Sequence, residues 1–133
     1  MKRRTFIRIA TTASVALYLP NIQCRHKTKP STKLFAHPEA LQHMCDSKTI
    51  HEIGEIYQKQ AKDESDETVL VKLLSADKQG KPISETADSA SIASILSQKI
   101  QQDFEQNKIV VVNGWVLSLT EARQCALFSL TEN

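Results

Sequence analysis

The chain has 133 residues, 41% of them hydrophobic, 24% charged and only 5% aromatic, a composition that predicts a globular protein with a mainly aliphatic core. Eight of the 17 basic residues lie in residues 1–34, which hold no acidic residue, so nine basic and 15 acidic residues remain in 35–133, a net charge of −6. A folded part of this sign offers no electrostatic surface for nucleic acid, so that class of partner is excluded.

The chain begins with a pattern that is typical of an export signal. A basic start is followed by an apolar run from Ile9 to Leu19, too short for a membrane-spanning helix of about 20 residues. The start holds the twin-arginine motif, of which the matching residues are Arg3, Arg4, Phe6 and Ile7. Residues 1–24 are therefore predicted to be a signal that directs the chain to the twin-arginine translocase and the periplasm. An ordinary export signal whose two arginines are accidental is the alternative.

The twin-arginine route carries proteins that have folded before export, and the usual reason to use it is a cofactor inserted in the cytoplasm. The rest of this chain has no glycine-rich nucleotide loop, no Cys-x-x-Cys pair and only three glycines. We therefore expect no cofactor and no catalytic residues in it. One explanation is that the chain folds early, binds a partner that holds a cofactor and carries this partner out. The alternative is that the chain folds fast and uses the route alone.

Cys24 follows the signal region at the position of a lipoprotein attachment cysteine. Residues 21–23 depart from the usual Leu-small-small pattern, so acylation, cleavage nearby and an uncleaved amphipathic anchor all stay open. Acylation with two or more chains would anchor the protein firmly to the membrane. Residues 25–36 are basic and are predicted to be an extended tether, with a disordered linker that merely solvates as the alternative.

Residues 37–133 are predicted to form one mainly helical domain of about five helices with a short β-ribbon near residues 109–117. The first three helices are short, and their expected ranges are about 38–46, 47–61 and 69–74. The second helix begins either with a capping box of Thr49 and Glu52 or one turn earlier at Ser47. The residues expected to face the core are Leu41, Met44, Cys45, Ile50, Ile53, Tyr57, Val69, Leu70, Leu73 and Leu74.

The strongest helical periodicity in the chain predicts a long helix that begins near Asp88. Its expected core residues are Ile92, Ile95, Leu96, Ile100 and Phe104. Four consecutive β-branched residues, 109–112, then favour extended structure, and Asn113-Gly114 is the preferred sequence of a type I′ hairpin turn. Ser118 and Glu121 form a second capping box, which opens the last helix.

Several of these features together resemble one known family. They are the twin-arginine signal, the long helix, the element Ile53-Gly54-Glu55-Ile56-Tyr57, and the β-branched turn that leads into Thr120-Glu121-Ala122. These features are similar to the small subunits of membrane-bound flavin dehydrogenases of the fructose, sorbitol and gluconate type. The resemblance implies a non-catalytic subunit that escorts and stabilises a large flavin subunit of the glucose-methanol-choline type, while a separate cytochrome subunit carries the electrons away. It assigns no catalytic residue to this chain.

Four potential metal ligands, His37, His43, Cys45 and His51, lie within 15 residues. At about 100° per residue, His43 and Cys45 would face opposite sides of a helix, so we expect surface histidines beside a core cysteine, and no metal. Cys45 and Cys125 are also the two thiols that an oxidising compartment would favour joining. A disulfide between them would stabilise the fold by about 4 kcal/mol in the loop-entropy model, and two buried free thiols are the alternative.

Trp115, the only tryptophan, comes directly after the hairpin turn. It either covers the core beneath the ribbon or belongs to an apolar ribbon face that is left for a partner. The residues of this predicted partner surface are Val110, Val112, Trp115 and Leu117. Glu121 and Arg123 need no catalytic role, because a helix cap explains Glu121 and a solvated or salt-bridged position explains Arg123.

These patterns predict an exported subunit or assembly factor of a periplasmic oxidoreductase, without chemistry of its own and bound to a larger flavoprotein dehydrogenase subunit. The alternative is a free-standing, membrane-tethered lipoprotein with a structural or binding function. An enzyme is disfavoured, because the sequence offers no nucleophile with its base and no paired carboxylates at a useful spacing.

Overall fold

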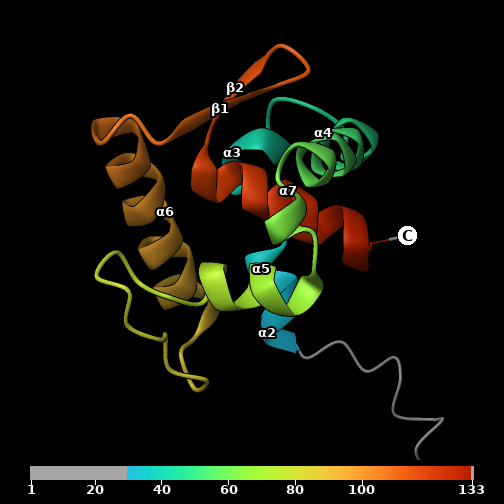
Figure 1. The fold of residues 1–133 in the computed structure, drawn as a ribbon. Helices are drawn as coiled ribbons and strands as arrows, with labels where there is room; N and C mark the ends of the chain where they lie inside the picture. The colour runs from blue at the N-terminus through green and yellow to red at the C-terminus, as the bar shows by residue number, and fades with distance from the viewer. Residues whose placement is uncertain (1–29, 133) are drawn as a thin grey trace, which may run out of the picture.

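Residues 30–132 are described by the computed structural model, and six α-helices and one two-stranded antiparallel sheet lie in this range (Figure 1). In chain order the elements are α2 (Pro30–Phe35), α3 (Glu39–Gln42), α4 (Ser47–Gln60), the 3₁₀ turn η2 (Lys62–Glu64), α5 (Glu67–Leu74), α6 (Ser89–Glu105), β1 (Ile109–Val112), β2 (Trp115–Ser118) and α7 (Leu119–Thr131). The predicted mainly helical fold with one ribbon is confirmed. The export motif and Cys24 lie outside the described residues, and no helix within them is long and apolar enough to cross a membrane.

Helix α7 is the central element, because nine of its 13 residues are buried and it runs between α4, α5 and α6 (Figure 1). The predicted capping box at its start is confirmed. Ser118 Oγ accepts a hydrogen bond from the Glu121 backbone N–H at 3.1 Å, and Glu121 Oε2 accepts one from the Ser118 N–H at 2.9 Å. These two hydrogen bonds provide acceptors for backbone N–H groups that an uncapped helix leaves without partners.

Helix α4 approaches α7 very closely where Gly54 lies between them. A Cβ atom built on Gly54 would lie 2.0 Å from the carbonyl oxygen of Cys125 and 2.8 Å from Ser129 Oγ. One turn later, Gln58 Nε2 donates a hydrogen bond to Ser129 Oγ at 2.6 Å. The absence of a side chain at position 54 therefore lets the two backbones meet.

The start of α4 differs from both predictions. Asp46 is its N-cap, because Asp46 Oδ1 accepts hydrogen bonds from the Thr49 backbone N–H at 2.9 Å and from Thr49 Oγ1 at 2.6 Å. Ser47 and Thr49 are therefore inside the helix, and neither is the cap. The preceding helix is also shorter than predicted, since α3 ends at Gln42. Three residues predicted to face the core are exposed: Met44, Val69 and Phe104.

The folded part begins earlier than predicted. Helix α2 starts at Pro30, inside the range 25–36 that was expected to be a tether. Thr32, Phe35 and Ala36 are all buried. From Pro30 onwards the tether prediction is therefore wrong, because the apolar side chains of Phe35 and Ala36 belong to the hydrophobic core.

In α6, Ile92 and Leu96 are buried as predicted, but near the C-terminal end Asp103 is buried in place of Phe104. The carboxylate oxygen Oδ2 of Asp103 accepts hydrogen bonds from the backbone N–H of Thr120 at 2.8 Å and from Thr120 Oγ1 at 2.6 Å. This pair fastens the end of α6 to the first turn of α7. The two hydrogen bonds from Thr120 compensate the Asp103 carboxylate for the loss of water, which explains why this polar residue can be buried.

The predicted hairpin is confirmed, since β1 and β2 pair antiparallel and Asn113 and Gly114 have φ angles of 49° and 82°. Positive φ at both residues is what a type I′ turn requires. Val112 and Leu117 are buried, and Val110 and Trp115 are partly buried and pack against the core. This face, predicted to be a partner surface, therefore covers the core; that prediction is wrong, and the alternative for Trp115 agrees with the structure.

Candidate functional site

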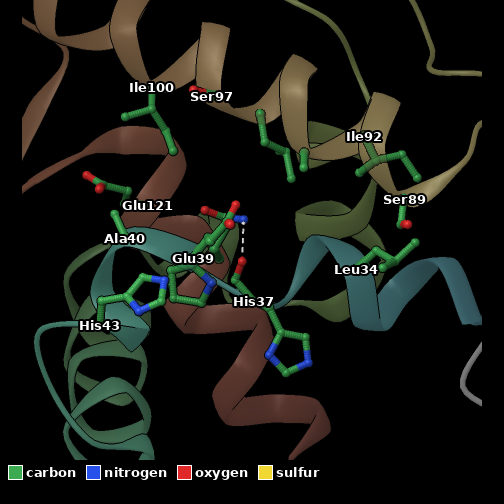
Figure 2. Close-up of a pocket in the computed structure, with 14 residues that line it drawn as sticks. Leu34, His37, Glu39, Ala40, His43, Ser89, Ile92, Ser97, Ile100 and Glu121 are labelled. Atoms are coloured by element: carbon green, nitrogen blue, oxygen red, sulfur yellow. Dashed lines mark hydrogen bonds between the residues drawn. The ribbon is translucent and has the colours of Figure 1, made fainter.

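One concave feature is a pocket of about 380 Å³ with α6 on one side and the α2–α3 segment on the other, and with residues of α7 between them (Figure 2). Seven of its 14 lining residues are apolar, and apolar atoms make up most of its surface. The apolar lining residues are Leu34, Pro38, Ala40, Ile92, Ala93, Leu96 and Ile100. Both its size and its lining are typical of sites for small molecules.

One buried polar group in this pocket lacks a partner. Gln124, on α7, is only 2% exposed, and its Nε2 donates a hydrogen bond to the carbonyl oxygen of His37 at 3.2 Å. Its Oε1 has no hydrogen-bond partner among residues 30–132. A buried acceptor without a donor costs about 1–3 kcal/mol, so such an atom commonly marks the place of a water or a ligand.

The charged groups of the pocket are acidic. Glu121 is buried, and its Oε2 accepts hydrogen bonds from both the N–H and the hydroxyl of Ser118. Glu39 is exposed and also lines the pocket. None of the described lining residues is Lys or Arg. The polar residues that line the pocket therefore include two glutamates and Gln124, whose side-chain oxygens are hydrogen-bond acceptors.

The structure does not bring the four potential metal ligands together. His37 and His43 line the pocket, and His37 Nδ1 lies 2.7 Å from Gln42 Nε2. His51 is on α4 instead, where its Nδ1 is 3.8 Å from a carboxylate oxygen of Glu55. Within the described part of the chain, no three His, Cys, Asp or Glu residues form a group that could hold a metal ion.

Cys45 and Cys125 are both free thiols in the structure, which is the alternative to the predicted disulfide. Cys125 is buried within α7, and burial raises the pKa of its thiol. Cys45 is partly buried, and its Sγ donates to the carbonyl oxygen of Leu41 at 3.4 Å. A thiol with a raised pKa holds little thiolate at neutral pH and is a poor nucleophile.

The salt-bridged interpretation of Arg123 is confirmed. Its guanidinium donates from Nε to Glu64 Oε2 at 2.8 Å and from the terminal nitrogen to Oε1 at 2.7 Å, and the Tyr57 hydroxyl donates to the same Oε2 at 2.6 Å. These bonds with Arg123 hold the pKa of Glu64 below its usual range. Nearby, burial lowers the pKa of Lys99 to about 8, and its ammonium donates to the carbonyl oxygen of Leu73 at 2.8 Å. These groups connect α4, η2, α5, α6 and α7, so their role is structural.

The outer side of the hairpin is a second candidate site. Ile109, Val111 and Val116 are 45%, 60% and 59% exposed. Val111 and Val116 are direct partners across the two strands, and Ile109 is two residues before Val111 and hence on the same face. We call these three residues the outer ribbon face. Figure 1 shows the hairpin extending beyond the helices at the top of the view.

Neither site is indicated by the sequence. An amide in a surface helix normally points to water, so Gln124 carries no signal of its own, although the run of small and apolar residues around it is typical of a helix that is buried on most sides. Strand alternation gives the hairpin two apolar faces, and the sequence does not say which of them covers the core, so the outer ribbon face is not predicted either.

Comparison of the chain with protein-family models, curated proteins and solved structures finds no match.

Proposed function

We propose that this chain is an exported, non-catalytic accessory subunit that binds a larger flavin-dependent oxidoreductase and escorts it to the periplasm. The observation that carries the proposal is the outer ribbon face, where three β-branched apolar side chains lie together and remain exposed. Apolar side chains grouped on the surface of a small domain commonly mark a contact with another protein.

The hairpin has three properties that favour contact with a partner: it is fixed to the core, its exposed side chains are β-branched, and its outer strand edges are unpaired within the described part of the chain. Its inner residues Val112 and Leu117 are buried, so the ribbon is fixed to the core. β-Branched side chains have few χ1 rotamers, so little side-chain entropy is lost when a partner covers them. The outer edges of β1 and β2 are not paired with another strand in the described part of the chain, and a partner can add backbone hydrogen bonds there.

The class of partner comes from the N-terminal sequence and from the resemblance. Arg3, Arg4, Phe6 and Ile7 match the motif of a route that exports folded proteins. The resemblance to small subunits of flavin dehydrogenases suggests that the partner is a flavoprotein. Such a partner needs this route, because its flavin is inserted before export. Together they favour an escort over a chain that travels alone.

The test is affinity capture of the tagged full chain from the membrane and periplasmic fractions of bacteria, read out as protein-bound flavin. The double variant Val111→Thr with Val116→Thr keeps the β-branched shape and makes the outer ribbon face polar. Val69→Thr, at an exposed apolar position on α5, is the matched control. We expect the wild type and the control to capture a flavoprotein, and the ribbon variant to capture at least tenfold less. Equal capture by all three, or no captured flavin with the wild type, would refute the proposal.

The second candidate is a free-standing, membrane-tethered lipoprotein with a binding function, which the pocket beside α6 favours. Two measurements distinguish the candidates: acylation of Cys24 and capture of a flavoprotein. Mass spectrometry that finds acylated Cys24 in a protein that captures no flavoprotein would select this second candidate.

A further inference from the structure

We infer that the pocket between α6 and the α2–α3 segment is a binding site for a small apolar amine. This site is distinct from the outer ribbon face, and the inference does not depend on the escort function. Three features carry it: an apolar lining, a buried acceptor without a partner, and two glutamates with no lysine or arginine among the described residues that line the pocket.

The apolar lining selects the body of the ligand. Side chains from three separate elements, such as Leu34 on α2, Ala40 on α3 and Leu96 on α6, line a volume of about 380 Å³ (Figure 2). Removing apolar surface from water contributes about 25 cal/mol per Å², so a hydrocarbon body gains free energy on entering. The volume suits a molecule with a short alkyl chain or one ring rather than a large cofactor.

The unpaired acceptor selects the polar end of the ligand. Gln124 Oε1 has no hydrogen-bond partner among the described residues, and the amide is fixed by its bond from Nε2 to the His37 carbonyl oxygen. Rotating the amide would place its oxygen against another carbonyl oxygen and lose that bond. The free position therefore accepts a hydrogen bond, and a ligand fits it with an N–H or O–H donor.

The charges favour a cationic donor. Glu39 and Glu121 both line the pocket, and residues 35–133 carry a net charge of −6. A carboxylate ligand would meet repulsion from both glutamates, whereas an ammonium group would be attracted by them in a site that is partly shielded from water. An alkylamine therefore combines the three features better than an alcohol or a fatty acid of the same length.

The inference can be tested with three probes of equal chain length: hexylamine, hexanol and hexanoate. Binding of each to the full chain would be measured by calorimetry and by NMR shifts at neutral pH. We expect saturable binding of hexylamine, at least tenfold weaker binding of hexanoate, and hexanol between them. No saturable binding of hexylamine, or equal binding of hexanoate, would overturn the inference and leave a pocket that holds only water.

Two matched variants locate the site. Ser97 is exposed on α6 and lines the pocket, whereas Ser94 is exposed on the same helix and does not line it. Ser97→Trp should reduce hexylamine affinity at least tenfold, and Ser94→Trp should leave it unchanged, with equal urea midpoints showing that both variants fold. Equal affinities of the two variants would place the amine elsewhere and overturn the inference.

A third variant tests the charge. Glu121→Gln preserves the capping box, because Gln also serves at this position of the motif. It should weaken hexylamine binding several-fold and leave hexanol binding unchanged. An equal effect on both probes would show that the carboxylate does not recognise the ammonium group. Flavoprotein capture is measured separately, so failure of this site and failure of the escort proposal are distinguishable.

Discussion

Replacing Gly54 with Ala tests the packing of α4 on α7, on which the whole domain depends. The added Cβ would lie 2.0 Å from the Cys125 carbonyl oxygen and 2.6 Å from its carbonyl carbon, so the helices must separate by about 1 Å to reach even 3.0 Å. These neighbours are backbone atoms, which cannot rotate away as a side chain can. The separation would also loosen Ile50, Ile53 and Tyr57, which are buried on the same face of α4.

The expected net loss is about 2 kcal/mol or more in the free energy of unfolding. Overpacking costs about 1–3 kcal/mol and occasionally more, and Ala in a helix recovers about 1 kcal/mol relative to Gly. A backbone clash belongs at or above the upper end of that range. For a domain of this size, such a loss lowers the Tm by roughly 10 °C.

Urea denaturation followed by circular dichroism measures this loss. Gly80→Ala is the control, because Gly80 has φ of 82° and no atom lies within 4 Å of the Cβ built there. Only left-handed strain opposes that change, at a cost of about 1 kcal/mol. If Gly54→Ala destabilised the protein no more than Gly80→Ala, the proposed close contact between α4 and α7 would be wrong.

Two substitutions and one chemical modification test individual interactions. Asp103→Ala leaves the N–H and hydroxyl of Thr120 unpaired, so the free energy of unfolding in urea should fall by about 1–3 kcal/mol. The bonds from Arg123 keep the pKa of Glu64 below its unfolded value of about 4.3, so their stabilising effect is complete above that pH and is lost as the pH falls through the lower folded pKa. Glu64→Gln should therefore flatten the loss of Tm as the pH falls from about 5 to about 3. Burial raises the pKa of Cys125, so iodoacetamide should modify this thiol only after denaturation, as shown by peptide mapping.

Each of these expectations has a contrary outcome. Asp103→Asn keeps an oxygen acceptor and should lose less stability than Asp103→Ala; equal losses would show that the hydrogen bonds to Thr120 contribute little. Acid unfolding of Glu64→Gln that runs parallel to the wild type would remove Glu64 as a source of the pH dependence. Rapid modification of Cys125 in the native protein would show that α7 is less tightly packed than the structure indicates.

Local patterns in the sequence predicted most of the secondary structure. Asn113-Gly114 between β-branched residues specified the hairpin, and Ser118 with Glu121 specified the start of α7, because each signal depends on neighbours a few residues apart. Where two local signals competed, the sequence was less decisive. The predicted starts of α4 were Ser47 and the capping box of Thr49 with Glu52, whereas the structure has Asp46 as the cap, one position before Ser47.

Long-range packing could not be predicted in the same way. Phe35 and Ala36 follow a basic stretch that resembled a tether, and only their contacts with distant parts of the chain place them in the core. The close approach at Gly54 and the burial of Gln124 likewise depend on which helices meet. The pocket is formed by α2, α3, α6 and α7 together, so no single segment of the sequence indicates it.

The escort function is tested most directly by following the partner rather than this chain. The flavoprotein captured by the tagged chain would be quantified in periplasmic and cytoplasmic fractions of cells that carry either the wild type or the double variant Arg3→Lys with Arg4→Lys. We expect the wild type to place the flavoprotein in the periplasm, and the double variant to leave it in the cytoplasm with its flavin bound. Equal amounts of periplasmic flavoprotein in both strains would contradict the account.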